Sequence, residues 1–325
     1  MMDMWNRVNR KYNDIKKDWK ADCQFSKKYA LLRFKDTVSR QIGLNKISDS
    51  AFKKREEYLI KYLRDCLSPV LDKYCNQKTE GEYVPKAPIW VCWWTGRENA
   101  PLIVQQCIKS IYNNAGVHPV ILLSEKNYSQ YLNVPDFILD RMKSGKMGLA
   151  HFSDYIRISL LEQYGGLWLD ATIFCSKPIS DKFFCYPFFT LKSPYKESRF
   201  VSKYQWVTFC LGAWKNNLFY SFVKEAFEKY WYENDIAIDY LFFDYIILLA
   251  KQNCSYISQL MDNVPNSELH RDDLQAAMNE ALSAEQFYNV VQDDTGLYKL
   301  SWRENYSKTT TKGEMSVYAF FLSMT

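Results

Sequence analysis

The sequence predicts an α/β fold that follows a separate helical segment. From residue 89 onward, short apolar runs alternate with longer stretches of helical periodicity, and this alternation is typical of a parallel sheet with right-handed helical crossovers. A polar stretch with one Gly and two Pro, residues 77–88, separates this part from an N-terminal part whose pattern is helical, as expected where turn-forming residues mark a boundary. The run Leu167-Trp168-Leu169 is wholly apolar, which indicates a central strand buried on both faces.

The N-terminal segment, residues 1–80, is predicted to be helical and basic. It holds 19 Lys and Arg against 11 Asp and Glu, whereas the rest of the chain holds 23 against 26. Its first apolar residues recur three or four positions apart and therefore share one helix face: Trp5, Val8, Tyr12, Ile15 and Trp19. Cations beside such a stripe suit an anionic membrane surface, so residues 1–20 are predicted either to lie at the inner face of the plasma membrane or to pack on the protein. A nucleic-acid partner is not expected, because no recognition motif accompanies the basic excess.

Length and composition indicate an ordinary globular protein that stays inside the cell. The 325 residues, 47% hydrophobic and 24% charged, can form one large domain, predicted at residues 88–325, beside the helical segment. The N-terminus has no apolar core of the kind that a signal peptide needs, and the longest apolar run, Tyr240–Ala250, is too short to span a bilayer. Because the nine cysteines show no paired spacing, reduced thiols in the cytoplasm are expected rather than a disulfide framework.

The predicted elements of the α/β part follow one another as strand, helix, strand, helix, helix and strand. They are Ile89–Trp94, Pro101–Asn113, Pro119–Leu123, Tyr128–Lys143, Leu149–Tyr164 and Leu167–Leu169. The last of these helices has an apolar side and ends at Gly165-Gly166, a typical C-terminal stop signal.

Asp170 follows the strand at residues 167–169, at the carboxyl end where open α/β sheets bind ligands. A carboxylate next to so apolar a strand needs a partner, and a metal ion that bridges two phosphates would be one. The chain has three His and no HExxH motif, so the metal is predicted to be an oxygen-ligated one, Mn²⁺ or Mg²⁺. Strand alternation would place Thr172 on the same side, where its hydroxyl could bind the metal, a water ligand or the substrate.

Asp154 and Arg157 are three residues apart on the predicted helix before this strand, so their side chains share a face. If the N-terminal half of the helix lies at the carboxyl end of the sheet, Asp154 can accept hydrogen bonds from sugar hydroxyls and Arg157 can contact phosphate. The alternative is a surface ion pair without a functional role, which is the commoner meaning of this spacing.

The segment at residues 150–174, AHFSDYIRISLLEQYGGLWLDATIF, resembles the donor-binding core of bacterial capsular polysaccharide synthesis glycosyltransferases. That group is similar to glycosyltransferase family 32 with its DxD-type sugar-binding region. The resemblance continues upstream in IWVCWWTG and, more weakly, downstream in DYLFFDYIILL and YKLSW. It covers residues 88–302, about two thirds of the chain.

The resemblance implies a GT-A-like fold, in which a nucleotide-binding sheet has an acidic motif at a strand end. It implies that Asp154 and Arg157 contact the sugar and phosphate of a nucleotide-sugar donor, and that Asp170 is a catalytic residue and metal ligand. It also implies that the aromatic end of the first strand, Trp93 to Thr95, lies near the base of the donor, with Trp94 and Thr95 as donor-binding residues. The sequence departs from DxD because Thr172 stands at the second acidic position, which weakens the expected dependence on metal.

Two further candidates come from the C-terminal half. Asp239 and Asp244 flank an aromatic helical run and could face the acceptor. Asp244 is the candidate for a catalytic role, with a structural hydrogen bond as the alternative. Trp302, with Asp293 and Asp294, precedes or enters a late strand that could close over the donor, and Trp302 could equally be a core residue.

The function that the resemblance implies is a metal-dependent hexosyltransferase. It would move a hexose from a nucleotide sugar, a UDP-sugar in the first place, to a polysaccharide or lipid-linked oligosaccharide, with retention of the anomeric configuration. Two alternatives stay open: a sugar-phosphate transferase of capsule assembly, and a non-catalytic membrane-associated scaffold with the same fold.

Overall fold

The computed structural model describes residues 16, 18–194, 199–267, 270–282, 287, 289, 291 and 295–324, and it confirms the α/β class. The strands are β1 (Ile89–Cys92), β2 (Val120–Leu123), β3 (Gly166–Leu169), β4 (Ile173–Cys175), β5 (Phe188–Thr190), β6 (Cys210–Ala213) and β7 (Leu297–Lys299). A five-stranded sheet has the order β2-β1-β3-β6-β5, and a small second sheet pairs β4 with β7.

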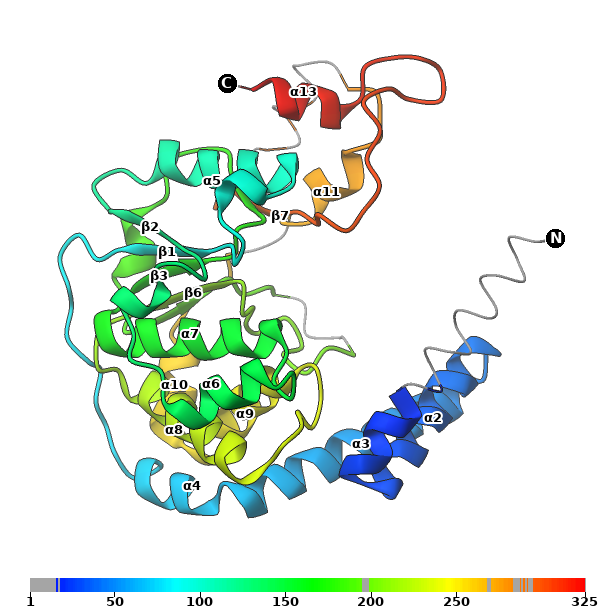
Figure 1. Ribbon diagram of the computed structural model, residues 1–325, viewed down its shortest axis with the longest axis vertical. Helices are drawn as coiled ribbons and strands as arrows, with labels where there is room; N and C mark the ends of the chain where they lie inside the picture. The colour runs from blue at the N-terminus through cyan, green and yellow to red at the C-terminus, as the bar shows by residue number, and fades with distance from the viewer. Residues whose placement is uncertain are drawn as a thin grey trace.

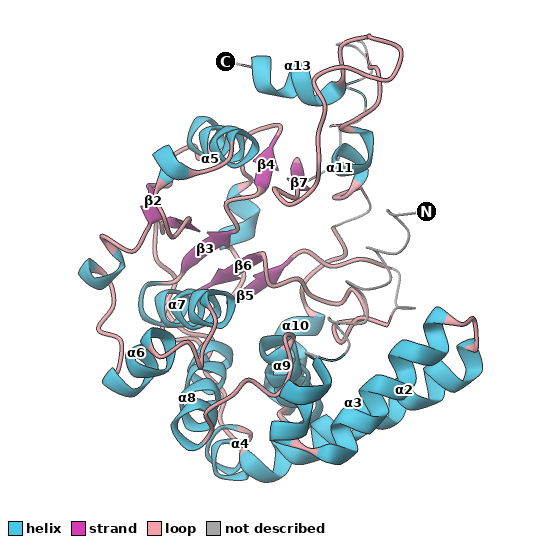
Figure 2. Cartoon of the chain, turned by 45° about the vertical axis from the view of Figure 1, so that its right-hand side comes forward, coloured by secondary structure: helices cyan, strands magenta, loops and turns pink. Residues whose placement is uncertain are grey.

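Helices precede the sheet, cover it and follow it. They are α2 (Lys27–Gln41), α3 (Asn45–Cys66), α4 (Ser68–Tyr74), α5 (Leu102–Asn114), α6 (Asp136–Lys143), α7 (Leu149–Tyr164), α8 (Leu218–Glu233), α9 (Phe242–Asn253), α10 (Ser255–Asp262), α11 (Asp273–Ala277) and α13 (Val317–Ser323). Short 3₁₀ turns lie at η1 (Arg97–Asn99), η2 (Tyr128–Gln130) and η3 (Asp181–Phe184). Helix α5 lies on one side of the main sheet and α7 to α10 lie on the other (Figure 1, Figure 2).

The predicted parallel sheet is present at its β2-β1-β3 side, and β6 departs from it. Ile89 of β1 pairs in parallel with Val120 of β2 and with Leu167 of β3. Strand β6 runs antiparallel to both of its neighbours, β3 and β5. The described residues between β5 and β6 contain no helix, and an antiparallel neighbour can be reached without the helical crossover that a parallel one needs.

The glycine pair after α7 ends the helix and begins the central strand, as predicted. Both residues have positive φ angles, 68° at Gly165 and 98° at Gly166, in a region that residues with a side chain rarely adopt. A Cβ atom on Gly166 would lie 2.2 Å from the carbonyl oxygen of Pro88. Only glycine therefore lets β3 enter the sheet this close to β1, with its residues 166–169 all buried.

The segment Tyr128–Lys143, predicted to be mostly helical, is helical only at its two ends. It forms the turn η2 and, after an extended stretch, the helix α6. Pro135 stands immediately before α6 with a φ of −54°, and a proline disfavours helical geometry in the residue that precedes it. The proline therefore breaks the predicted helix at this point.

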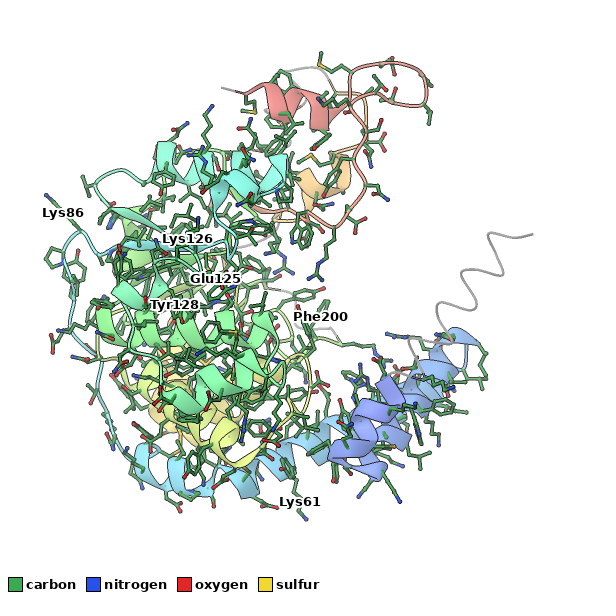
Figure 3. All side chains as sticks on the ribbon, in the orientation of Figure 1. Lys61, Lys86, Glu125, Lys126, Tyr128 and Phe200 are labelled. Carbon is green, nitrogen blue, oxygen red and sulfur yellow. A yellow bond between two sulfur atoms is a disulfide. The ribbon has the colours of Figure 1, made fainter. Side chains whose placement is uncertain are left out.

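The N-terminal helices form a long arm that packs on the α/β part through α3 and α4 (Figure 1). The hydroxyl of Tyr29 donates to the Oδ2 of Asp239 at 2.5 Å. Arg199 donates to the carboxylates of Asp36 and Asp49, at 2.5 and 2.6 Å, and Phe200 beside it lies on the side of the α/β part that faces the arm (Figure 3). Residues 1–15, and with them most of the predicted apolar stripe, lie outside the described residues.

One pair of cysteines departs from the prediction of reduced thiols. Cys75, just after α4, forms a disulfide with Cys254, between α9 and α10. The two residues are 179 positions apart, so the spacing along the chain gives no sign that folding brings them together.

Across the described residues, no helix combines the length and the apolar character needed to cross a membrane. Most of the apolar run Tyr240–Ala250 forms α9.

Candidate active site

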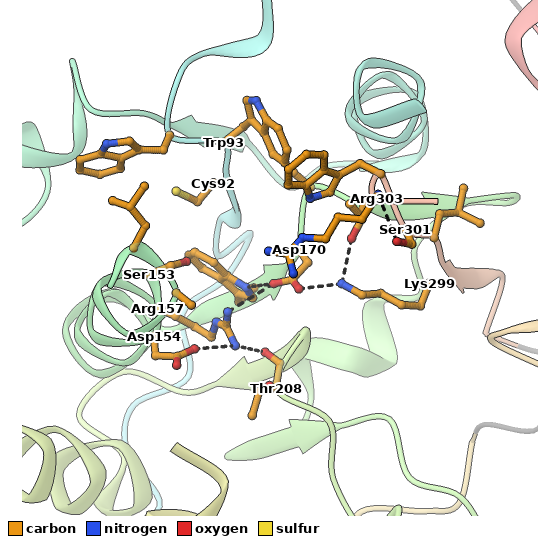
Figure 4. Close-up of a pocket in the computed structure, with 18 of the residues that line it drawn as sticks. Cys92, Trp93, Ser153, Asp154, Arg157, Asp170, Thr208, Lys299, Ser301 and Arg303 are labelled. Atoms are coloured by element: carbon orange, nitrogen blue, oxygen red, sulfur yellow. Dashed lines mark hydrogen bonds and ion pairs between the residues drawn. The ribbon is translucent and has the colours of Figure 1, made fainter. Parts of the chain in front are cut away.

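A pocket of about 810 Å³ opens at the carboxyl ends of β1 and β3. Its walls come from the N-terminal half of α7, the start of α9 and the segment after β7 (Figure 4). All eight residues predicted for the site line it: Trp94, Thr95, Asp154, Arg157, Asp170, Thr172, Asp244 and Trp302.

Helix α7 brings Asp154 and Arg157 to the pocket because of the direction in which it runs. Its C-terminus joins β3 through the glycine pair, so its N-terminal half lies at the opposite, carboxyl end of that strand. Ser153, Asp154 and Arg157 line the pocket from this half. The sequence could not fix this position, and the structure places both residues where a ligand could reach them.

Asp170 is held as a carboxylate by cationic and N–H donors. The indole of Trp168 donates to Oδ1 at 2.9 Å, and Arg157 contacts the same oxygen at 3.3 Å. The ammonium group of Lys299 donates to Oδ2 at 2.8 Å. Burial alone would raise the pKa of Asp170, but the charges of Lys299 and Arg157, with the hydrogen bonds from Lys299 and Trp168, hold the pKa at about 2. Asp170 is therefore ionised at neutral pH.

Arg157 is buried and joins two acids of the pocket. One terminal nitrogen donates to the carbonyl oxygen of Thr208 and lies 3.5 Å from Asp154, and the other contacts Asp170. Its guanidinium carbon lies 4.8 Å from the ring centroid of Trp168. Both terminal nitrogens of the Arg157 guanidinium group contact protein oxygens. Arg157 therefore orients the two aspartates and adds positive charge to the pocket.

Asp154 and Asp244 lie in the same pocket but have few positive neighbours. Burial raises the pKa of Asp154 to about 7, against the charge of Arg157 and with added repulsion from Asp244 and Asp170. Burial likewise raises the pKa of Asp244 to about 6, although a hydrogen bond from Trp206 lowers it. The indole of Trp206 donates to Oδ1 of Asp244 at 2.8 Å, so Asp244 has a structural bond and also faces the pocket.

Aromatic rings line the pocket near the end of β1. Trp94 packs against Phe152 and Tyr128, each with ring centroids 5.4 Å apart. Trp93 meets Trp302 edge to face at 5.8 Å. Trp302 is 45% exposed, so it is not the core residue that the sequence left open. Exposed indole rings of this kind can stack on a nucleobase or a sugar face.

Thr172 and Asp170 share a side of the chain, but a turn brings them together and strand alternation does not. Ala171 and Thr172 form the turn, and the amide of Ile173 donates to the carbonyl oxygen of Asp170 at 2.9 Å. Lys299 then donates to the Thr172 hydroxyl at 2.8 Å as well as to Asp170.

The predicted metal ligands do not fit a divalent ion in this arrangement. Lys299 lies between Asp170 and Thr172, and both oxygens of Asp170 already accept hydrogen bonds. Mg²⁺ and Mn²⁺ bind through one or two carboxylates with oxygens free to coordinate, and waters and phosphates complete the ligand set. Among the residues that the structure describes, no three His, Cys, Asp or Glu side chains form a group that could hold a metal ion.

Residues 39–320 match the protein-family model described as capsular polysaccharide synthesis protein, which covers most of the chain. The chain belongs to this family. A search of curated proteins gives no match.

In this member of the capsular polysaccharide synthesis family, the matched region begins within α2 and ends within α13. It therefore includes every wall of the pocket. It also includes α3 and α4, which the sequence alone assigned to a separate N-terminal segment.

Two cationic residues that line the pocket, Lys299 and Arg303, were not predicted from the sequence. Lys299 stands inside the segment YKLSW, which already showed the resemblance to capsular polysaccharide enzymes. It reaches Asp170 only because β7 pairs with β4, an association across more than a hundred residues. Of the other candidates, Asp239 bonds to Tyr29 of the arm, and Asp293 and Asp294 lie outside the described residues.

Proposed function

We propose that the protein is a glycosyltransferase that moves a hexose from a nucleotide sugar to a growing capsular polysaccharide or its lipid-linked precursor. The supporting observation is the pocket at the carboxyl ends of β1 and β3. It combines aromatic rings and cations with one carboxyl group of lowered pKa and two of raised pKa. The family assignment supports a role in capsule synthesis, and a UDP-sugar is the first donor to test.

The chemistry assigns a different task to each part of the pocket. Trp94 and Trp302 would hold the base or the sugar by stacking. Arg157 and its positive neighbours would face the diphosphate, whose charge grows as it leaves. An acceptor hydroxyl oxygen forms the new bond to the anomeric carbon on the face from which the diphosphate departs, as retention requires. The bond from that carbon to the β-phosphate oxygen breaks, and its electron pair leaves with the diphosphate.

The acceptor hydroxyl must lose its proton in this step, and Asp244 is the proposed recipient. A base works best when its pKa lies near the working pH, and the pKa of Asp244 is raised to about 6 by burial. Its Oδ1 is held by Trp206, which orients the carboxylate in the pocket. The segment at residues 150–174 favours a glycosyltransferase over a non-catalytic scaffold. Its charged side chains Asp154, Arg157 and Asp170 line the pocket and contact one another.

The test is thermal unfolding against a panel of nucleotides and nucleotide sugars, followed by product identification. A ligand at about 100 times its dissociation constant stabilises the native state by about 2.7 kcal/mol, which is a clear shift in Tm. We expect a shift with one nucleoside diphosphate and its sugar conjugate, and release of that diphosphate during turnover. Release of a monophosphate would show a sugar-phosphate transferase, and the absence of any shift would favour the scaffold. The anomeric proton of the product, seen by NMR, tests the retention that the resemblance implies.

A further inference from the structure

Lys299 is fixed beside Asp170 by the small second sheet. It is the last residue of β7 and pairs with Ile173 of β4. The amide of Leu300 donates to the carbonyl oxygen of Thr172 at 2.9 Å, and the amide of Lys299 donates to the backbone carbonyl oxygen of Arg271 at 2.9 Å. These backbone bonds on both sides of the residue set where its side chain begins, so the ammonium group has a defined place in the pocket.

The Lys299 ammonium group occupies the position between the two predicted metal ligands. It donates to Oδ2 of Asp170 and to the hydroxyl of Thr172, both at 2.8 Å. Figure 4 shows Lys299 and Arg157 reaching Asp170 from opposite sides. An ammonium group has three N–H donors, so these two bonds leave one for a ligand, and the side chain is 27% exposed.

The groups in contact with Asp170 favour an anion over a third cation. One carboxylate, Asp170, contacts two cations, Lys299 and Arg157, and Arg303 lines the same pocket. A divalent ion bound together with a diphosphate needs at least one carboxylate oxygen free to coordinate it, and both oxygens of Asp170 already accept hydrogen bonds. The residue at the second acidic position is instead Thr172, whose neutral hydroxyl accepts from Lys299.

We infer that Lys299 does in this protein what a divalent cation does in DxD-type glycosyltransferases: it neutralises the diphosphate of the donor, and the protein transfers sugar without a metal. The inference rests on the proposed function, because it names the group that meets the diphosphate in the same pocket.

In the transfer step, Lys299 changes no bond of its own. The bond between the anomeric carbon and the β-phosphate oxygen breaks, and the electron pair goes to that oxygen. The nucleoside diphosphate gains one negative charge, which the ammonium group opposes through its remaining N–H donor. Asp170 and Thr172 hold the ammonium group in place.

The experiment measures binding of nucleoside mono- and diphosphates by calorimetry, in EDTA and in Mn²⁺, with wild type and Lys299→Met. The probes are UDP, GDP, ADP, CDP and dTDP with the matching monophosphates. Lys224→Met is the matched control, since Lys224 lies 3.2 Å from Glu162 with a side-chain exposure of 30%, close to that of Lys299, but does not line the pocket. Thermal unfolding of each variant reports on the fold.

We expect wild type to bind one nucleoside diphosphate equally in EDTA and in Mn²⁺. Lys299→Met should weaken that binding roughly 10- to 100-fold, the usual effect of a charged hydrogen bond, and weaken the monophosphate less than threefold. Lys224→Met should bind as wild type does.

Two results would overturn the inference and leave the proposed function standing. One is diphosphate binding that disappears in EDTA and returns with Mn²⁺. The other is a folded Lys299→Met protein that binds the diphosphate as tightly as wild type. If wild type binds none of the nucleotides in either condition, the proposed function fails and the role of Lys299 fails with it.

Discussion

Aspartates line two sides of the pocket, and their electrostatic surroundings differ. On the strand side, Asp170 contacts Lys299 and Arg157, and its pKa is held at about 2. On the helical side, Asp154 and Asp244 are buried with fewer cations, and burial raises their pKa values to about 7 and about 6. Burial opposes ionisation on both sides, so the neighbouring charges decide the difference.

Under the proposed function, the two sides of the pocket have different tasks. A carboxylate that is always ionised can hold cations in place but cannot take up a proton at neutral pH. A carboxyl group with a pKa near neutrality can do so. Arg157 contacts Asp154 at 3.5 Å and Asp170 at 3.3 Å, and therefore links the two sides.

Asp170→Asn should have the largest effect, because it removes the charge that organises the strand side. Without the carboxylate, Lys299 and Arg157 lose their shared partner, and the proposed diphosphate site loses its geometry. We expect turnover to fall by roughly 100- to 1000-fold, the range for loss of a key electrostatic group. Initial rates with the donor found in the nucleotide panel measure it.

The same variant must be shown to be folded, by circular dichroism and thermal unfolding. A folded Asp170→Asn protein with near-normal turnover would contradict the role of Asp170 in the site.

Asp244→Asn should have the next largest effect, because it removes the proposed proton acceptor on the helical side. The amide can still accept the hydrogen bond from Trp206, so the fold should be kept. We expect turnover to fall about 100-fold, at the lower end of the range for a general base.

The pH profile gives the sign of this effect. In wild type, kcat/KM should fall as the pH drops through about 6, the raised pKa of Asp244, because the protonated acid cannot take up a proton. In Asp244→Asn this acid limb should be absent. An unchanged limb in the variant would assign the titration to another group.

The chain itself predicted the helix α7, the strand β3 and the turn between them, because a long periodic helix, a glycine pair and an apolar run are local signals. That Asp154 and Arg157 belong with Asp170 came from the family resemblance, because the pattern alone left open where the N-terminal half of the helix lies. In the structure the connection from α7 to β3 through the glycine pair brings the three residues to the same pocket.

Other parts of the fold and site depend on contacts between distant residues. Lys299 reaches Asp170 through the pairing of β7 with β4, and Cys75 meets Cys254 through the packing of the helices. The antiparallel direction of β6 also has no local signal. Spacing along the chain carries no information about such associations, so the position of a single lysine could not be read from the sequence.

Thr172→Asp combined with Lys299→Met should replace the ammonium group on the strand side with a metal ion. The double variant removes the ammonium group and adds the carboxylate that a DxD motif has. We expect the turnover of Lys299→Met alone to be the same with and without Mn²⁺. The turnover of the double variant should rise about 10-fold when Mn²⁺ is added, since two carboxylates can hold the ion. A double variant that gains no response to Mn²⁺ would contradict the view that Lys299 stands at a metal's position.

Asp154→Asn should have the smallest effect and should appear in stability. The pKa of Asp154 is raised from 3.8 to about 7 in the folded protein, so the native state binds this proton more tightly than the unfolded chain. Its contribution to stability is full below pH 4 and is lost as the pH rises through 7. Asparagine cannot ionise, so at pH 8 the variant should be more stable than wild type, by on the order of 1 kcal/mol, and its stability should change less between pH 5 and 8.

Chemical denaturation at pH 5 and pH 8 measures this difference, and Asp170→Asn is the matched contrast. The pKa of Asp170 is lowered to about 2, so its contribution is present above pH 4 and lost only as the pH falls toward 2. Replacing it should therefore destabilise the protein at pH 8, where replacing Asp154 stabilises it. If both variants shifted stability in the same direction at pH 8, the two sides of the pocket would not differ in charge as their surroundings indicate.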